Sequence, residues 1–182
     1  MEKRIPSSSQ TVGPYFRIGL DYLIDQMPMM GAAGAIEIRG RVLDRDGAPV
    51  PDAMLEFWSA GNEEDASSKP QKHGVPDAFR RVATDMEGSF AVKIGKPVES
   101  HSEEDVRVQA PHMMVLVFAR GLMRHLITRV YLEDEFGIEG DPVLLGVPEE
   151  RRGTLIAKRA GANVYRWDVI LQGADETVFF AW

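Results

Sequence analysis

The sequence predicts an all-β protein, a β-sandwich of short strands with long loops, an N-terminal arm and one short helix. Short segments alternate apolar and polar side chains, which is the period of a half-buried strand. Turn-forming groups such as Asp44–Gly47 and Asp85–Gly88 separate these segments. Many short strands divided by turns in this way favour a sandwich or a barrel over a helical fold.

The chain begins with a stretch that lacks a regular period. Gly13-Pro14 and Gly31–Gly34 punctuate it as loops. The piece Tyr15–Leu20 is too apolar for a free tail, and we interpret it as an arm that packs on another surface, with a second subunit as one candidate. We therefore divide the chain into an arm, residues 1–35, and a β-sandwich domain, residues 36–182.

The strands follow from the alternation, taken in order along the chain. They are Ile36–Leu43, Ala53–Trp58, Phe79–Thr84, Ser89–Ile94, Met113–Phe118, Leu126–Leu132 and Tyr165–Leu171. Polar loops are expected over 61–77 and 95–105, and a further loop over 133–148. The one helix is expected over Glu149–Arg159, because Pro148 precedes it and two apolar residues give it a buried side.

Composition excludes several classes of function. The 182 residues include 21 basic and 28 acidic ones, for a net charge of −7, and an acidic chain without a stripe of Lys and Arg is a poor nucleic-acid binder. No apolar run is long enough to span a membrane, and the first residues lack the apolar core of a secretory signal. The absence of cysteine excludes disulfides and thiolate metal sites, and it fits a reducing, cytoplasmic location.

Seven motifs occur in an order that is similar to one enzyme family. They are Gln10–Phe16, Gly40–Val50, Leu55–Trp58, Ala110–His112, Phe118–Gly121, Leu126–Tyr131 and Tyr165–Gly173. Each motif is weak alone, but together they cover nearly the whole chain and resemble the intradiol ring-cleavage dioxygenases. Thr154–Arg159 and Gly173–Phe180 resemble in particular the alpha-type chain of the two-subunit members.

The resemblance implies an enzyme built from alpha-type and beta-type chains of one fold. The beta-type chain is expected to hold a non-haem ferric ion, Fe(3+), with two tyrosines and two histidines. The implied substrates are protocatechuate, whose two hydroxyls chelate the iron, and O2. The implied product of cleavage between the hydroxyls is 3-carboxy-cis,cis-muconate.

This chain lacks most of that ligand set. Its tyrosines are Tyr15, Tyr22, Tyr131 and Tyr165. In iron-holding members the ligand tyrosines fall in regions that match 61–77 and 95–109, where this chain has none. His112 matches the first residue of a His-x-His pair, whose two imidazoles share one face of a strand, but the second position is Met114, a poor ligand for a hard ion. We therefore expect a vestigial metal site, with no metal and no catalytic residue in this chain.

A purely structural role is the favoured interpretation of His112. It would then be a core histidine hydrogen-bonded to the backbone, because a single imidazole cannot form the metal site.

The resemblance implies four substrate-binding residues, Thr11, Gly13, Pro14 and Arg120. Gly13 would let the backbone approach the ring and Pro14 would hold the loop in shape, with an ordinary turn as the alternative. Arg120 would offset the substrate carboxylate, with a structural ion pair or a solvated strand end as the alternative.

These observations predict a catalytically silent alpha-type subunit that completes the substrate pocket of a ferric beta-type partner in a hetero-oligomer. The alternative is a stand-alone β-sandwich module for binding or structure that has lost the iron site. An apolar arm favours the subunit, because a module without a partner has little reason to keep one. The apolar end Val178–Trp182 is likewise expected to be buried against a neighbour.

Overall fold

The computed structural model describes residues 8–20, 35–59, 79–101 and 107–181. The predicted loop over 61–77, the arm residues Tyr22 and Gly31–Gly34, and the terminal Trp182 lie outside the described residues. Within the described ranges no helix is long and apolar enough to cross a membrane.

The described residues form short strands and still shorter helices. The strands are β1 Ala35–Leu43, β2 Met54–Ser59, β3 Phe79–Ala83, β4 Ser89–Gly95, β5 Ser100–His101, β6 Val108–Gln109, β7 His112–Phe118, β8 Leu126–Leu132, β9 Ile156–Gly161, β10 Val164–Arg166 and β11 Val169–Ile170. The α-helices are α1 Gly13–Ile18, α4 Pro142–Leu145 and α5 Glu149–Arg152, and the 3-10 turns are η1 Ile138–Gly140 and η2 Gly153–Leu155.

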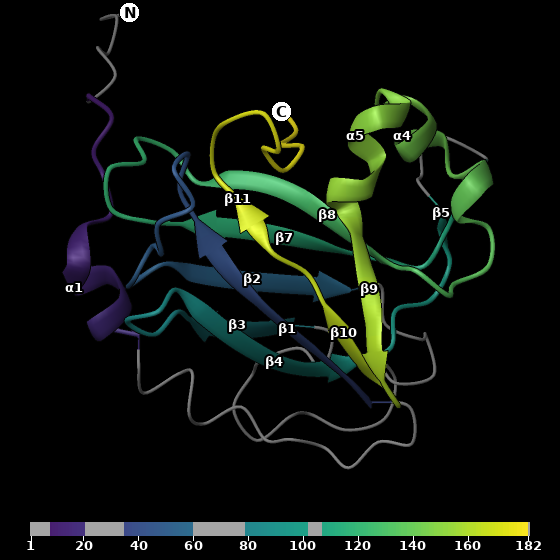
Figure 1. Ribbon diagram of the computed structural model, residues 1–182, viewed down its shortest axis with the longest axis horizontal. Helices are drawn as coiled ribbons and strands as arrows, with labels where there is room; N and C mark the ends of the chain where they lie inside the picture. The colour runs from purple at the N-terminus through teal and green to yellow at the C-terminus, as the bar shows by residue number, and fades with distance from the viewer. Residues whose placement is uncertain (1–7, 21–34, 60–78, 102–106, 182) are drawn as a thin grey trace, which may run out of the picture.

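One continuous path of strands builds both layers of the fold (Figure 1). The path runs β1, β10, β9, β8, β7, β2, β3, and β4 pairs with the other side of β1. β9 joins the layers, because it pairs antiparallel with β10 and parallel with β8. The sheet is therefore nearly closed, and the prediction of an all-β sandwich is confirmed.

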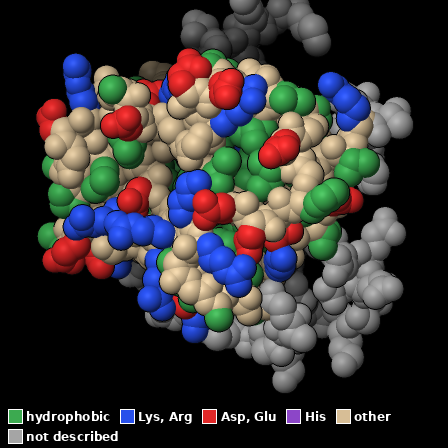
Figure 2. Space-filling view, turned by 45° about the vertical axis from the view of Figure 1, so that its right-hand side comes forward, with side chains coloured by type: hydrophobic (Ala, Val, Ile, Leu, Met, Phe, Trp, Pro, Cys, Tyr) green, Lys and Arg blue, Asp and Glu red, His purple; other side chains and the backbone are tan. Residues whose placement is uncertain are grey.

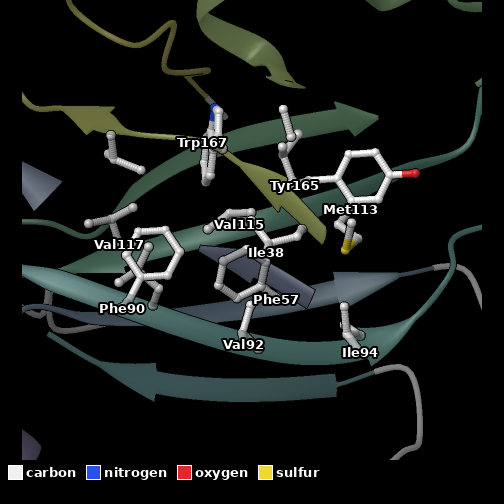
Figure 3. Close-up of a cluster of buried hydrophobic side chains, with 14 of the residues drawn as sticks. Ile38, Phe57, Phe90, Val92, Ile94, Met113, Val115, Val117, Tyr165 and Trp167 are labelled. Carbon is white, nitrogen blue, oxygen red and sulfur yellow. The ribbon is translucent and has the colours of Figure 1, made fainter. Parts of the chain in front are cut away.

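The main core lies between the two layers (Figure 3). Alternate residues of β4 and β7 point into it, such as Val92 and Ile94 on one side and Val115 on the other. The ring centroids of Phe57 and Trp167 lie 6.4 Å apart at its centre. These contacts explain why the alternating segments of the sequence form a half-buried sheet on each side.

Gly40 is required by the close approach of β1 to the chain between β10 and β11. A Cβ atom at this position would lie 1.7 Å from the Trp167 carbonyl oxygen. The Trp167 N–H also donates to the Arg39 carbonyl at 2.9 Å. The single strand predicted over Tyr165–Leu171 is therefore two short strands, both parallel to β1, with this contact between them.

The helix predicted over Glu149–Arg159 is wrong in its second half. Only α5 and the turn η2 are helical, and β9 begins at Ile156. Ile156 and Ala157 pair in parallel with Tyr131 and Leu132 of β8. The distant partner strand outweighs the local helical pattern, which is a common result for short segments.

The helices α1 and α4 were not predicted. α1 begins at Gly13 within the arm, and α4 begins after Asp141 within the expected loop over 133–148. The Asp141 carboxylate accepts the Val143 and Leu144 N–H groups, so Asp-Pro at 141–142 was an N-cap signal. Figure 1 shows α1 and α4 at opposite ends of the molecule.

The C-terminal segment packs on its own domain and stays partly exposed, so its burial against a neighbour remains a prediction. The Phe180 N–H donates to the Ile127 carbonyl at 2.8 Å, and the Thr128 hydroxyl donates to the Val178 carbonyl at 2.7 Å. Phe179 packs against the main core.

On the face shown in Figure 2, basic and acidic side chains are interspersed with apolar ones and form no single basic stripe.

Candidate functional site

The structure divides the predicted site residues between the two ends of β7. His112 and Met114 lie at its beginning, on the face opposite the core-facing Met113 and Val115. Arg120 follows its end, where Thr11 and the start of α1 also lie. At about 3.3 Å per residue β7 is roughly 20 Å long, so these residues do not form one site.

His112 is buried and held by the backbone. Its side chain is only 8% exposed, and its Nδ1 lies 2.8 Å from the Ala110 carbonyl oxygen, which makes Nδ1 the protonated nitrogen. Burial lowers the pKa of His112 below its usual value, and the charge of Arg129 lowers it further. The imidazole is therefore neutral and fixed as part of the core.

Asp141 organises the same end of β7. It is fully buried, and its carboxylate accepts hydrogen bonds from the Tyr131 hydroxyl at 3.0 Å and from the Ala110 N–H at 2.9 Å. It also caps α4 through two backbone N–H groups. Burial, aided by the negative charge of Asp141, raises the pKa of the Tyr131 phenol well above its usual value. Tyr131 is thus held as a neutral phenol whose hydroxyl donates a hydrogen bond to a carboxylate.

Arg129 occupies the remaining position beside Met114. The two residues are cross-strand partners in β7 and β8, and Arg129 is 7% exposed. Its guanidinium donates to the Gln109 side-chain oxygen at 2.7 Å. A fixed buried cation opposite the thioether of Met114 disfavours a second cation nearby.

The residues at this end do not fit a ferric ion. A hard ion needs anionic oxygen and free imidazole ligands, but this end supplies one imidazole, a thioether, a neutral phenol and a guanidinium. Its one carboxylate, Asp141, already accepts hydrogen bonds on both oxygens. Nor do the described parts of the chain contain a group of three or more His, Cys, Asp or Glu residues with the placement of a metal site.

The N-terminal arm packs at the other end of β7. The Gly121 N–H donates to the Thr11 hydroxyl oxygen at 2.9 Å, and the rings of Phe16 and Phe118 lie 5.2 Å apart. Gly13, at the start of α1, has a φ of +64°, and a Cβ atom there would meet nothing within 4 Å, so its backbone conformation and not crowding favours glycine. Pro14 follows it in the first turn of α1, where its missing N–H costs nothing.

Arg120 makes an ion pair at this end. One guanidinium nitrogen lies 3.3 Å from the Asp52 carboxylate, and the Arg120 side chain remains 51% exposed. The other Asp52 oxygen lies 3.3 Å from Arg17 of α1. The structural ion pair considered for Arg120 therefore exists, and half of the side chain still faces outward.

The structure brings together Thr11, Gly13, Pro14 and Arg120 and separates them from His112 and Met114. The residues that sequence reasoning missed are Asp52, Arg17, Asp141 and Arg129. Only Asp141 had a local signal, since an aspartate before proline is typical of a helix start. The others are defined by partners that are distant in sequence.

Comparison with known proteins identifies the family. The model of the family described as "Dioxygenase" matches residues 21–173. The chain is 42% identical to the protocatechuate 3,4-dioxygenase alpha chain of Burkholderia cepacia, with 94% of this chain and 95% of that one covered. The chain belongs to the intradiol dioxygenase family.

A second relative and a solved structure extend the comparison. The chain is 28% identical to the protocatechuate 3,4-dioxygenase beta chain of Burkholderia cepacia, with 78% of this chain and 66% of that one covered. The crystal structure of hydroxyquinol 1,2-dioxygenase from Pseudomonas putida DLL-E4 superposes with a TM-score of 0.59 at 21% identity. That match covers 92% of this chain and 68% of the other, and it shows the shared fold.

Proposed function

We propose that this chain is the alpha subunit of a protocatechuate 3,4-dioxygenase and pairs with a beta subunit that holds Fe(3+). The 42% identity to an alpha chain over 94% of this chain carries the proposal. The weaker similarity to a beta chain supports a hetero-oligomer of two chains with one fold. The complex would add both atoms of O2 to protocatechuate and open its ring between the hydroxyls to give 3-carboxy-cis,cis-muconate. The lack of cysteine supports a cytoplasmic location.

The first end of β7 supports the iron-free role of this subunit. His112 and Met114 are, on this proposal, the vestigial positions of a His-x-His pair. The His112 imidazole is bonded to the Ala110 carbonyl and the Tyr131 phenol to Asp141, so both groups serve the core. The iron of the complex would supply its ring-cleaving chemistry from the partner alone.

The second end of β7 supports a role in the partner's substrate pocket. The proposal keeps the division into an arm, residues 1–35, and a domain, residues 36–182, and the described part of the arm, residues 8–20, would face the beta subunit. Arg120 would offset the carboxylate of protocatechuate with the exposed half of its guanidinium. Gly13 would let the backbone approach the ring, and Pro14 would hold the loop in shape. Thr11 would fix this segment to the turn after β7 by accepting the Gly121 N–H.

The test is co-expression with the candidate beta chain, followed by measurement of O2 uptake on protocatechuate. Each chain alone serves as a control, and iron content is measured in every preparation. We expect the pair to co-purify with iron and to consume O2, while this chain alone binds no iron and is inactive.

Two outcomes would contradict the proposal in different ways. O2 uptake by this chain alone would mean that it holds a functional iron site. Failure of the two chains to co-purify would instead favour the stand-alone β-sandwich module.

A further inference from the structure

We propose that Asp52 is a positioning residue, which holds Arg120 in place and fixes the arm to the end of β7. This inference rests on the proposed function for its catalytic consequence. Asp52 itself does not contact the substrate on this proposal. It acts through the two arginines that its carboxylate bridges.

The bridge joins two segments that are distant in sequence. Asp52 Oδ1 lies 3.3 Å from Arg17 of α1, and Asp52 Oδ2 lies 3.3 Å from Arg120 after β7. Without the carboxylate the two guanidinium groups would repel each other across the same small space. Asp52 therefore permits the arm and the Arg120 segment to lie side by side.

The turn that contains Asp52 is fixed by hydrogen bonds to Thr84. Thr84 is buried, and its hydroxyl donates to the Val50 carbonyl at 2.8 Å while accepting the Ala53 N–H at 2.9 Å. The Thr84 N–H also donates to the Ala53 carbonyl at 2.8 Å. These bonds bracket Asp52 on both sides, so its carboxylate projects from a fixed point.

The backbone of Asp52 points to a requirement for its side chain. Its φ is +60°, in the left-handed region where glycine is favoured and where aspartate and asparagine are the tolerated side chains. A turn that needed only this conformation would be served better by glycine. Aspartate here carries backbone strain that glycine would avoid, and its carboxylate is the group that makes both ion pairs.

The exposure of Arg120 suits an anionic ligand. Arg120 is the most exposed of the three side chains, with 51% of its surface accessible. Asp52 therefore orients Arg120 without covering its guanidinium. A carboxylate such as that of protocatechuate could pair with the exposed part.

The test compares Asp52→Asn with the wild type in the assembled two-chain complex. Asparagine tolerates the same backbone conformation but removes the charge. We expect the KM for protocatechuate to rise roughly fivefold while kcat stays nearly constant, because a partly exposed ion pair contributes an effect of this order. The Ki of 4-hydroxybenzoate should rise by a similar factor, whereas that of phenol, which lacks the carboxylate, should not change.

The matched control is Asp168→Asn. Asp168 is exposed to a similar extent as Asp52, 32% against 27%, and lies 3.5 Å from Arg166. It makes no described contact with the arm, so we expect its kinetic constants to match the wild type. A second comparison introduces Asp52→Asn into an Arg120→Gln background, where no further rise in KM is expected if Asp52 acts through Arg120.

A readout that does not depend on activity separates this inference from the proposed function. In this chain alone, Asp52→Asn should speed hydrogen exchange of the Gly121 N–H, which donates to Thr11 of the arm. Unchanged exchange together with an unchanged KM would overturn the inference, as would a further rise in KM in the Arg120→Gln background. If the wild-type complex fails on protocatechuate, the proposed function is overturned, and the exchange rate still decides whether Asp52 fixes the arm.

Discussion

The two ends of β7 use similar residue types for opposite purposes. At the His112 end, the buried Asp141 accepts four hydrogen bonds, and the arginine is buried against a neutral glutamine. At the Arg120 end, Asp52 bridges two arginines that remain partly exposed. In the first arrangement both Asp141 oxygens and His112 Nδ1 have partners within the domain. The second leaves positive charge at the surface, where a ligand or partner can use it.

On the proposed function, the His112 end corresponds to the place where the partner chain holds its iron, and here it is built from internal hydrogen bonds. The His112 end is closed by hydrogen bonds from Ala110, Tyr131 and α4 to one carboxylate. Because buried polar groups are costly unless paired, these bonds are what allow the end to remain intact. The following predictions test the contrast, from the largest expected effect to the smallest.

Asp141→Ala should give the largest loss of stability. It removes the acceptor for three buried donors and one partly buried donor, and we expect the free energy of unfolding to fall by about 3–5 kcal/mol, measured by urea denaturation of this chain. The control is Asp85→Ala, in an exposed turn where the carboxylate accepts two N–H groups, with an expected loss of about 1 kcal/mol. Equal losses for the two variants would contradict the closed character of the His112 end.

Arg120→Ala should leave the fold intact and weaken substrate affinity. Because the side chain is half exposed, we expect little change in the free energy of unfolding. In the assembled complex we expect the KM for protocatechuate to rise about tenfold, which corresponds to loss of one partly solvated charge pair. Arg166→Ala, which removes another exposed arginine, is the control. An unchanged KM would mean that Arg120 is only a structural ion pair.

His112 should make stability depend on pH. Its pKa is lowered in the folded state by burial and by Arg129, so as the pH falls through about 6.5 the unfolded chain takes up a proton that the folded chain does not. Stability is therefore lost as the pH falls, by at most about 1.4 kcal/mol per pH unit. The same unfolding measurements on His112→Gln, between about pH 7.5 and pH 5.5, should show a shallower dependence. Parallel curves for the two proteins would show that His112 is protonated in the folded state as well.

Met114→His should have the smallest effect of these variants. Although it recreates the His-x-His spacing, we expect it to bind no metal. Arg129 lies opposite this position and Tyr131 is held as a neutral phenol, so a second imidazole alone does not complete a ferric site. We expect no iron and no visible absorption after incubation with ferric salts, with the iron-loaded beta chain as the positive control. Stoichiometric iron in the variant would show that only the second histidine had been missing.

The sequence by itself determined the class of fold and showed that few residues suited to bind a ferric ion are present. Alternation in segments such as Ser89–Ile94 and Leu126–Leu132 predicts strands because side chains of a strand point to opposite faces, a strictly local property. The motif order identified the family. The presence of methionine at position 114, two residues after His112, and the small number of tyrosines are facts of residue type, which need no structure.

Only the tertiary structure decided which residues act together. The pairing of Asp52 with Arg17 and Arg120, and of Asp141 with Tyr131 and Ala110, depends on how separate strands and loops meet in space. The same holds for β9, whose strand form is stabilised by its partners β8 and β10 against a helical local pattern. Such contacts depend on register and on loop paths, which a single sequence does not specify locally. The physical reason is that alternation reports the environment of one side chain, whereas a site requires the relative positions of several.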